Sequence, residues 1–350
     1  LAGVLARHRG RDGHPAVLQP NYVTSSLAHA SGRWVRFDLP DLPPAYPRPG
    51  LWPAVAAGIR AGVWQPEFHA AFHYDPDRRR QDGLADDHAR AVTARGIMLF
   101  PGSERARELG AWRATEDLER DLDHALAVFN RLFGRPVGSV MAPDYHWDGR
   151  SEEMWAARGL RVIQGKREQI NPAWGGGSTG RVVKYLARHW DRWRHQDRTY
   201  LERNCRLEPV QAADPDRVVA ACVAATRRAW AAGQPAIVES HRVNFAHTDP
   251  LVAETGRAAL DRYLTEVTGD PEGAPLFLTD HEIAQRLRSG TSWAVRGRVV
   301  VVRNATRARR VVAIPEAALA RAAGQMAQGK GPRGFRLVAV PAQTVVDLVP

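Results

Sequence analysis

Short apolar runs alternate with amphipathic helical stretches along most of the chain, and this alternation constrains the fold more than any other feature. The spacing of apolar residues predicts helices over 51–63, 82–95, 115–133, 151–158, 214–232, 249–267 and 280–287. Apolar runs at 138–142, 160–164, 234–240 and 276–278 predict strands between them. A repeated order of helix, strand and polar loop is typical of a parallel sheet, with ligands beyond its carboxyl ends. We therefore expect an α/β fold.

Small polar residues mark the expected helix starts, because their side chains can accept hydrogen bonds from the first free backbone N–H groups. The expected N-caps are Thr115, Ser151, Asp214, Asp249 and Asp280. After Gly290 the pattern changes to strand-like runs at 293–303, 310–314, 336–340 and 345–349. We therefore divide the chain into a main domain over 1–290 and a small β-rich module over 291–350.

Composition narrows the class of protein. With 350 residues, 44% of them hydrophobic and 25% charged, the chain has the profile of a soluble globular protein. No apolar run approaches the roughly 20 residues that span a bilayer, so no membrane span is expected. Two cysteines, Cys205 and Cys222, imply no disulfide framework, and they leave the cellular compartment open.

The formal charge of +11 could indicate nucleic-acid binding. However, arginines are scattered through every segment, and only the stretches 78–80 and 307–310 form clusters. We interpret this as a basic solvated surface with no specific nucleic-acid partner, although weak attraction to anionic polymers stays open.

The stretch 64–75 contains two histidines four residues apart, His69 and His73, between Glu67 and Asp75. Two imidazoles at this spacing can bind one cation from a helix or from a strand that runs into a turn, with a carboxylate completing the set. The alternative is structural, because aromatic residues at 68, 72 and 74 alternate with the histidines and could form core. Spacing alone leaves both interpretations open.

Three further polar clusters follow predicted strands or loops. Pro143 breaks the apolar run at 138–142 and presents Asp144, Tyr145, His146 and Trp147, which could equally form a packed aromatic turn. His241 follows the strand predicted at 234–240, where an imidazole suits general acid chemistry. The stretch 200–209 is polar and compact but has no assigned role, and an irregular region as long as 165–209 is usually functional or a lid.

Several common sites are absent from the sequence. It contains no GxGxxG fingerprint in a strand-to-helix context, no phosphate-binding GxxxxGK[ST] loop, no HExxH and no GxSxG elbow. Cys205 has no positioned partner in the sequence, so it is a poor candidate for a thiol nucleophile.

Three motifs occur in a recognisable order: Pro66-Glu-Phe-His-x3-His73, Ala142-Pro-x-Tyr145 and Ser240-His-Arg-Val-Asn-Phe245. In this order the chain resembles the polysaccharide deacetylases of the NodB-homology superfamily, over roughly residues 15–288. The resemblance implies an incomplete or distorted (β/α) barrel and a divalent metal, most commonly zinc, held by two histidines and an aspartate. It implies a carbohydrate substrate.

The resemblance also implies roles for individual residues. His69 and His73 would bind the metal, and His241 would be the general acid that protonates the leaving amine. The residues expected to contact the sugar are Pro143, Asp144, Tyr145, Trp147, Arg242 and Asn244.

One family motif has no counterpart. The family places a pair of aspartates, a base and the third metal ligand, at the end of a strand before the histidines. Asp38 follows an apolar run, but the Pro-rich sequence after it does not fit. We expect the motif upstream of Leu1, and therefore weak metal binding and slow turnover by this chain.

Three functions follow from these motifs. The leading hypothesis is a metal-dependent hydrolase that removes acetyl groups from N-acetylated polysaccharide or oligosaccharide. The alternatives are a glycosidase that needs two carboxylates across the groove, with Glu67, Asp144 and Glu239 as the candidates, and a carbohydrate-binding relative without catalysis. The oligomeric state stays open.

Overall fold

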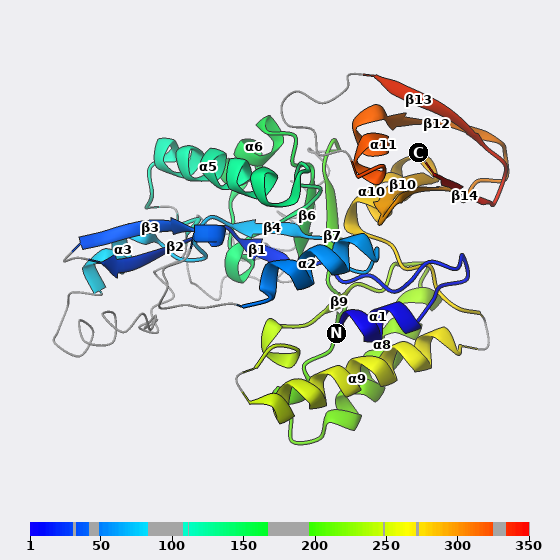
Figure 1. Cartoon of the computed structure of the whole chain (residues 1–350), viewed down its shortest axis with the longest axis horizontal. Coiled ribbons are helices and arrows are strands. Elements are labelled where there is room, and N and C mark those ends of the chain that lie inside the picture. Colours follow the sequence, from blue (N-terminus) through cyan, green and yellow to red (C-terminus); the bar gives the residue numbers. More distant parts are fainter. Residues whose placement is uncertain are drawn as a thin grey trace, which may run out of the picture. The chain divides into compact units, whose positions relative to one another are not determined.

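The computed structural model of this protein describes residues 1–30, 33–41, 49–82, 108–110, 112–166, 196–247, 249–270, 273–324 and 334–349 (Figure 1). The chain divides into two compact units, each made from separate stretches of sequence. The first unit comprises Leu1–Pro20, Leu51–Gln65 and Leu201–Pro350, and the second comprises Asn21–Gly50 and Pro66–Tyr200. The boundary predicted after residue 290 falls inside the first unit.

The second unit is built on a five-stranded sheet with the strand order β1-β4-β5-β6-β7. Its strands are β1 (Asn21–Val23), β4 (Glu67–Ala70), β5 (Val140–Met141), β6 (Val162–Gly165) and β7 (Thr199–Glu202). The pairs β1/β4, β4/β5 and β5/β6 are parallel. Because parallel neighbours need crossover connections, helices join these strands. The predicted mixed α/β class is confirmed, with a parallel sheet and helices.

Two helices of the second unit, α5 (Thr115–Phe133) and α6 (Gly149–Ala157), lie over one face of this sheet (Figure 1). The unit also contains the hairpin strands β2 (Ser25–Ala30) and β3 (Arg33–Asp38) and the short helix α3 (Pro76–Asp82). Apolar side chains of α5 and α6 form one buried core with Phe68, Val140 and Ile163 from successive strands. This core anchors the central strands from one side.

The helix of the second unit predicted over 115–133 has those bounds, but two of the unit's expected N-caps are wrong. Ala114 is the N-cap of α5, and no side chain caps this helix. Asp148 rather than Ser151 caps α6, because its carboxylate accepts the Ser151 backbone N–H at 2.9 Å. The helix predicted over 82–95 lies mostly outside the described residues, and α3 precedes it.

The first unit contains a helical layer and a short parallel pair of strands. Its helices are α1 (Ala2–Arg7), α2 (Leu51–Arg60), α8 (Pro215–Ala231), α9 (Pro250–Thr268), α10 (Asp280–Ser289) and α11 (Glu316–Ala322). The pair consists of β8 (Cys205–Arg206) and β9 (Val238–Glu239). One buried core joins α1, α8 and α9 and includes Leu5, Val223 and Leu260.

Sequence expectations for this unit are met in part. Asp214 and Asp249 cap α8 and α9 as predicted, each with Pro at the next position. The strand predicted over 234–240 is only two residues long, and the strand predicted at 276–278 is wrong, because residues 273–279 form no regular secondary structure. Thr279, rather than Asp280, caps α10 in a reciprocal capping box with Glu282.

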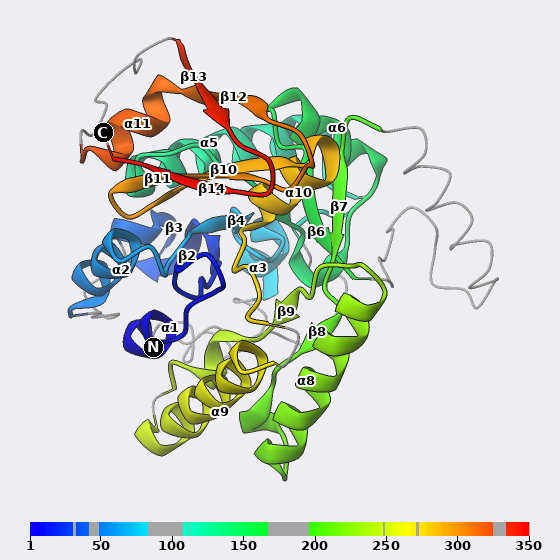
Figure 2. The same ribbon diagram turned by 90° about the vertical axis from the view of Figure 1, so that its right-hand side faces the viewer.

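The C-terminal part of the first unit confirms the predicted β-rich pattern (Figure 2). Strands β10 (Thr291–Arg296), β11 (Val299–Asn304) and β14 (Val345–Leu348) form a three-stranded antiparallel sheet. Strands β12 (Arg310–Pro315) and β13 (Phe335–Val340) form a separate antiparallel ribbon. A valine-rich core lies between sheet, ribbon and α11. The single run predicted over 293–303 is a hairpin that turns at Gly297, whose φ is +62°.

A buried ion network ties this β-rich part to the rest of the first unit. Glu282 on α10 pairs with Arg296 on β10 at 2.9 Å and also with Arg303 on β11. Arg303 in turn pairs with Asp12 at 2.6 Å. All four side chains are almost completely buried, so each charge depends on its partners.

None of the helices in the described part of the chain combines the length and the apolar character needed to cross a membrane.

Candidate functional site

Strained backbone collects where β4 and β5 end in the second unit. Three non-glycine residues there have positive φ: His73 at 69°, Asp144 at 51° and Tyr145 at 59°. Such conformations cost free energy and persist only where the surrounding structure enforces them, which is common at functional sites. The ends of β4 and β5 are therefore the candidate functional site of this unit.

The predicted histidine pair lies at this edge. His69 is on β4, His73 is in the turn that follows, and their ring centroids are 4.7 Å apart with planes inclined at 74°. Nδ1 of His69 lies 2.8 Å from the carbonyl oxygen of Met141 at the end of β5. A proton on Nδ1 donates to this carbonyl and places the lone pair on Nε2, the usual orientation of a metal-bound histidine.

The aromatic residues of the same stretch form core, as the structural interpretation predicts. Phe68, Phe72 and Tyr74 are buried in the core of the second unit. The Tyr74 hydroxyl accepts a hydrogen bond from the Leu27 backbone N–H at 2.8 Å, which ties this turn to the β2–β3 hairpin. Core-forming aromatic residues thus hold the backbone that carries the two histidines.

The carboxylates that flank the histidines in sequence have structural roles. Glu67 is buried and accepts from Arg135 at 2.7 Å and from the Gly138 and Ser139 backbone N–H groups at 2.9 and 2.8 Å. Asp75 accepts from the Trp112 indole N–H at 2.7 Å and caps α3. Within the part of the chain that the structure describes, no group of three or more His, Cys, Asp or Glu side chains is placed to hold a metal.

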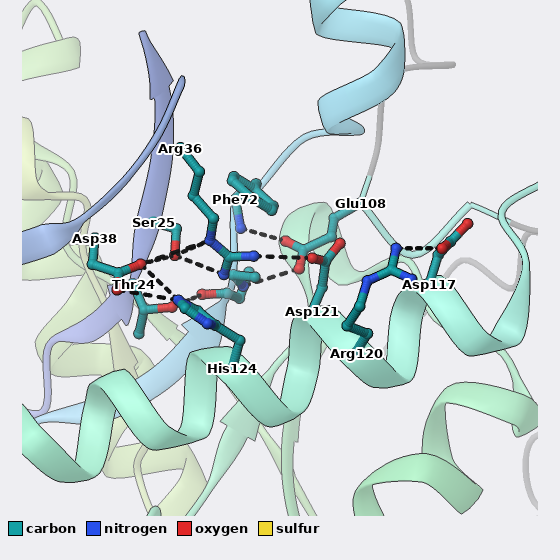
Figure 3. Close-up of polar contacts among 12 residues, drawn as sticks. Thr24, Ser25, Arg36, Asp38, Phe72, Glu108, Asp117, Arg120, Asp121 and His124 are labelled. Carbon is teal, nitrogen blue, oxygen red and sulfur yellow. Dashed lines mark hydrogen bonds and ion pairs between the residues drawn. The ribbon is translucent and has the colours of Figure 1, made fainter. Parts of the chain in front are cut away.

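A carboxylate that the sequence analysis missed, Glu108, fixes the turn around His73 (Figure 3). Its two oxygens accept the backbone N–H groups of Ala71, Phe72 and His73 at 2.8–2.9 Å. Burial raises the pKa of Glu108, against the opposing effects of these three donors and of the Arg113 cation. Since its partners lie 35–37 residues earlier in the chain, no local pattern marks it.

A small cavity of about 20 Å³ adjoins the histidine pair. His69, Glu108 and Pro143 line it, together with apolar side chains of α5 and α6. This volume holds about one water molecule. A sugar ring does not fit inside, so any carbohydrate would have to bind outside this cavity.

The Pro143–Trp147 turn serves mainly as packing. Pro143 is buried, and Trp147 is 1% exposed, with its indole N–H donating to Glu152 at 2.8 Å. The expected sugar contact of Trp147 loses support, because its ring belongs to the core. Asp144 is exposed, and the Tyr145 ring lies 4.8 Å from the Lys166 ammonium group. These two side chains are placed where a ligand could reach them.

Asp38, the one aspartate that resembled the missing family motif, lies on β3. It accepts from Ser25 at 3.0 Å and lies 2.9 Å from Nε2 of His124 on α5 (Figure 3). Burial alone would raise the pKa of Asp38, but bonds from His124 and Ser25 outweigh it and lower the pKa. Asp38 is thus part of an ion-pair network with Arg36 that also includes Asp121.

His241 lies in the first unit, directly after β9. Its side chain is 70% exposed, and its Nδ1 lies 2.6 Å from Glu208, a buried carboxylate that follows β8. Glu208 also accepts from the His241 backbone N–H at 3.0 Å. Because β8 and β9 are parallel, their ends bring histidine and glutamate together. Glu208 belongs to the polar stretch at 200–209, for which the sequence suggested no role.

Of the two predicted sugar contacts after His241, one has an exposed side chain and the other a buried one. Arg242 is exposed. Asn244 is fully buried, and its amide donates to Glu208 at 2.7 Å and to the Ser240 hydroxyl at 3.0 Å. The predicted sugar contact of Asn244 loses support, because its buried amide holds Glu208 and the turn in place. Gly256 on α9 permits this packing, since a Cβ there would lie 1.6 Å from the Asn244 carbonyl oxygen.

The predicted site residues thus form two groups: His69, His73 and the predicted residues of the Pro143–Trp147 turn lie in the second unit, and His241, Arg242 and Asn244 lie in the first. No protein-family model and no curated protein sequence matches this chain. The geometry of these two groups and the sequence motifs are therefore what bears on its function.

Proposed function

We propose that this protein is a metal-dependent amide hydrolase that removes acetyl groups from N-acetylated polysaccharide or oligosaccharide. The observation that supports it most is the packing of His69 against His73, with Nδ1 of His69 directed at the Met141 carbonyl. The substrate class and an incomplete or distorted (β/α) barrel come from the resemblance to the NodB-homology deacetylases. The parallel sheet of the second unit is compatible with such a barrel.

The donor set fits zinc in part. Two imidazoles with adjacent rings are suitable ligands, and a carbonyl behind one of them is the usual outer partner. A bound divalent metal would polarise the acetamide carbonyl and acidify a water molecule. The described residues supply no carboxylate as a third ligand, since Glu67 and Asp75 are held by other groups. We therefore expect this chain to bind zinc weakly.

His241 has the surroundings that a general acid needs. Glu208 accepts from Nδ1 and orients the ring, while the exposed side of the ring can present Nε2 to a leaving amine. Asn244 and the His241 backbone N–H hold Glu208 in turn. These contacts support His241 as the residue that donates the proton.

Zinc titration by calorimetry and acetate release from chito-oligosaccharides test the proposal. His69→Ala and His73→Ala should each weaken zinc binding by at least tenfold and abolish acetate release. His241→Ala should abolish acetate release while leaving zinc binding unchanged. His124→Ala, which removes a partly exposed histidine from α5, is the matched control. Unchanged zinc binding and unchanged acetate release in both pair variants would rule the proposal out.

The incomplete ligand set favours one alternative, a carbohydrate-binding protein without catalysis. Such a protein would bind chito-oligosaccharides equally well with and without a chelator, and it would release no acetate. The glycosidase alternative loses support, because Arg135 and two backbone N–H groups engage the carboxylate of Glu67. Release of reducing ends without acetate would restore it.

A further inference from the structure

Two arginines beside the buried ion network of the first unit have no acidic partner. Within the described part of the chain, the side chains of Arg11 and Arg286 form no ion pair and no hydrogen bond. Removing a cation from water is costly unless an anion or several acceptors engage it. Arg286, on α10, is half-buried, so the lack of a counter-ion at this position requires an explanation.

The register between α10 and β10 determines where Arg286 lies. Glu282, in the first turn of the helix, pairs with Arg296 at the end of the strand at 2.9 Å. Further along the helix, the Gln285 side chain accepts a hydrogen bond from the Trp293 backbone N–H at 2.7 Å. The two elements therefore run antiparallel. Because Arg286 is four residues after Glu282, it is on the same helix face and lies beside the start of β10.

A buried cation and a buried hydroxyl group lie at the same place on the β10–β11 hairpin. Ser292 pairs with Arg303 in the antiparallel register, and opposite residues share one face of the hairpin. Arg303 also pairs with Glu282, which shows that this face is the one toward α10. The Ser292 hydroxyl is buried and has no hydrogen-bond partner among the described residues. It is therefore a donor without an acceptor.

Arg11 reaches this place from the N-terminal segment. Its neighbour Asp12 pairs with Arg303 at 2.6 Å, which fixes the segment beside β11. Burial and then the cations of Arg11 and Arg303 lower the pKa of Arg286. The three arginines therefore lie close enough to repel one another, and Arg11 is exposed to solvent.

The charges in this region do not balance. Among the described residues around α10, two carboxylates and four guanidinium groups interact: Asp12 and Glu282 with Arg11, Arg286, Arg296 and Arg303. Both carboxylates are bound to the two buried arginines, so a surplus of two positive charges stays with Arg11 and Arg286. The nearby Asp347 on β14 pairs with His14 at 3.0 Å and does not contact either of them.

We propose that Arg11 and Arg286 bind a phosphate group, with Arg303 and the Ser292 hydroxyl at the inner end of the site. A phosphate group carries about −1.5 to −2 charges near neutral pH, which matches the surplus. Guanidinium groups bind phosphate oxygens through pairs of parallel hydrogen bonds. A carboxylate, with a single charge, would leave half of the surplus in place. The phosphate is either free in solution or part of a small phosphorylated metabolite.

The test is a calorimetric titration of the full chain with inorganic phosphate at neutral pH and constant ionic strength. Arg11→Gln and Arg286→Gln should each weaken phosphate binding by about tenfold or more, because each removes a charge-assisted interaction. Arg298→Gln is the matched control. It removes an exposed arginine from the turn at the other end of the β10–β11 hairpin and should leave binding unchanged.

Thermal unfolding separates weaker binding from misfolding. Without phosphate, Arg286→Gln should be at least as stable as the unmodified chain, because the substitution removes repulsion between cations. Phosphate should raise the melting temperature of the unmodified chain and of Arg298→Gln, but not that of Arg286→Gln. A second titration with glucose 6-phosphate distinguishes the two sources. Tighter binding than that of inorganic phosphate indicates a phosphorylated metabolite, and weaker binding indicates free phosphate.

Three results would overturn the proposal. The first is the absence of saturable phosphate binding to the unmodified chain. The second is phosphate binding by both Arg11→Gln and Arg286→Gln that is as tight as binding by Arg298→Gln. The third is an equal rise in melting temperature when chloride replaces phosphate at the same ionic strength, since this would show general screening of charge rather than a site.

Discussion

Glu108 controls the turn that carries His73, although it is no part of the histidine motif. Its carboxylate is the acceptor for three successive backbone N–H groups in a buried environment. Leaving such donors without acceptors costs more than an ordinary hydrogen bond contributes. The same turn contains His73, whose φ is positive. The geometry of the histidine pair therefore depends on this one distant side chain.

We predict that Glu108→Ala lowers the free energy of unfolding by roughly 2–4 kcal/mol, because it leaves three buried donors without acceptors. Zinc binding should weaken with it, since His73 loses its support. Glu108→Gln keeps one acceptor oxygen and should give a smaller loss in both measurements. Chemical denaturation and zinc titration of the two variants provide the check. Equal stability of Glu108→Ala and the unmodified chain would contradict this role.

At the scale of residues, sequence reasoning succeeds where the chemistry is local. The spacing of His69 and His73 and the position of His241 after an apolar run are properties of short segments. Glu208 and Glu108 were not recognised, because they meet their partners across 33 or more residues of chain. Trp147 and Asn244 were assigned to a sugar groove because burial cannot be read from a motif.

At the scale of elements, the helices with strong apolar periodicity were predicted well and the short strands poorly. A helix makes its own hydrogen bonds, so its pattern is complete within one segment. A strand is defined by its neighbour, and residues 276–278 have the apolar composition of a strand but no partner. The observed helix caps differ from the predicted ones by one residue at Thr115 and Asp280 and by three residues at Ser151, where Asp148 is the cap.

The ion pairs of the buried Glu282 join three elements of the first unit, so the stability of this unit depends on pH. Burial alone would raise the pKa of Glu282, but the cations of Arg296 and Arg303 outweigh it and lower the pKa below its ordinary value of 4.5. A carboxyl group with a lowered folded-state pKa contributes stability that is complete above the unfolded value. That contribution is lost as the pH falls below 4.5 and through the folded-state pKa.

We predict that the full chain loses thermal stability between pH 7 and pH 3. This loss should be smaller in Glu282→Gln. At pH 7 the same substitution should cost about 3–5 kcal/mol, because two buried arginines lose their shared counter-ion. Calorimetry at several pH values measures both effects. An unchanged acid dependence in Glu282→Gln would show that other carboxylates are responsible.

At the scale of the whole molecule, the alternation of helices and strands predicted the α/β class but not the two units. The first unit takes residues from three separate stretches, and Leu5 and Val63 share a core with α8 and α9. Hydrophobic periodicity identifies the buried face of a helix without identifying the element that covers it. A boundary was therefore predicted at residue 290, where the pattern changes, rather than where the core divides.

We predict that Leu5→Ala destabilises the first unit by about 2–5 kcal/mol, since it leaves a cavity in a core shared with α9. Amide exchange should accelerate in α8 and α9, more than 200 residues further along the chain. Val4→Ala, at a less buried neighbour, should have a smaller effect. Exchange measured by mass spectrometry tests this, and acceleration confined to residues near the substitution would contradict it.

The discontinuous first unit has a consequence for the order of events on the ribosome. Leu5 is synthesised before α9, which helps to bury it and ends only at Thr268. At roughly 5–20 residues per second, synthesis of the intervening chain takes about 13–50 s. All of the second unit is synthesised during that interval. The segment that carries Leu5 therefore lacks α9 for that time, and its apolar side chains are accessible to a chaperone.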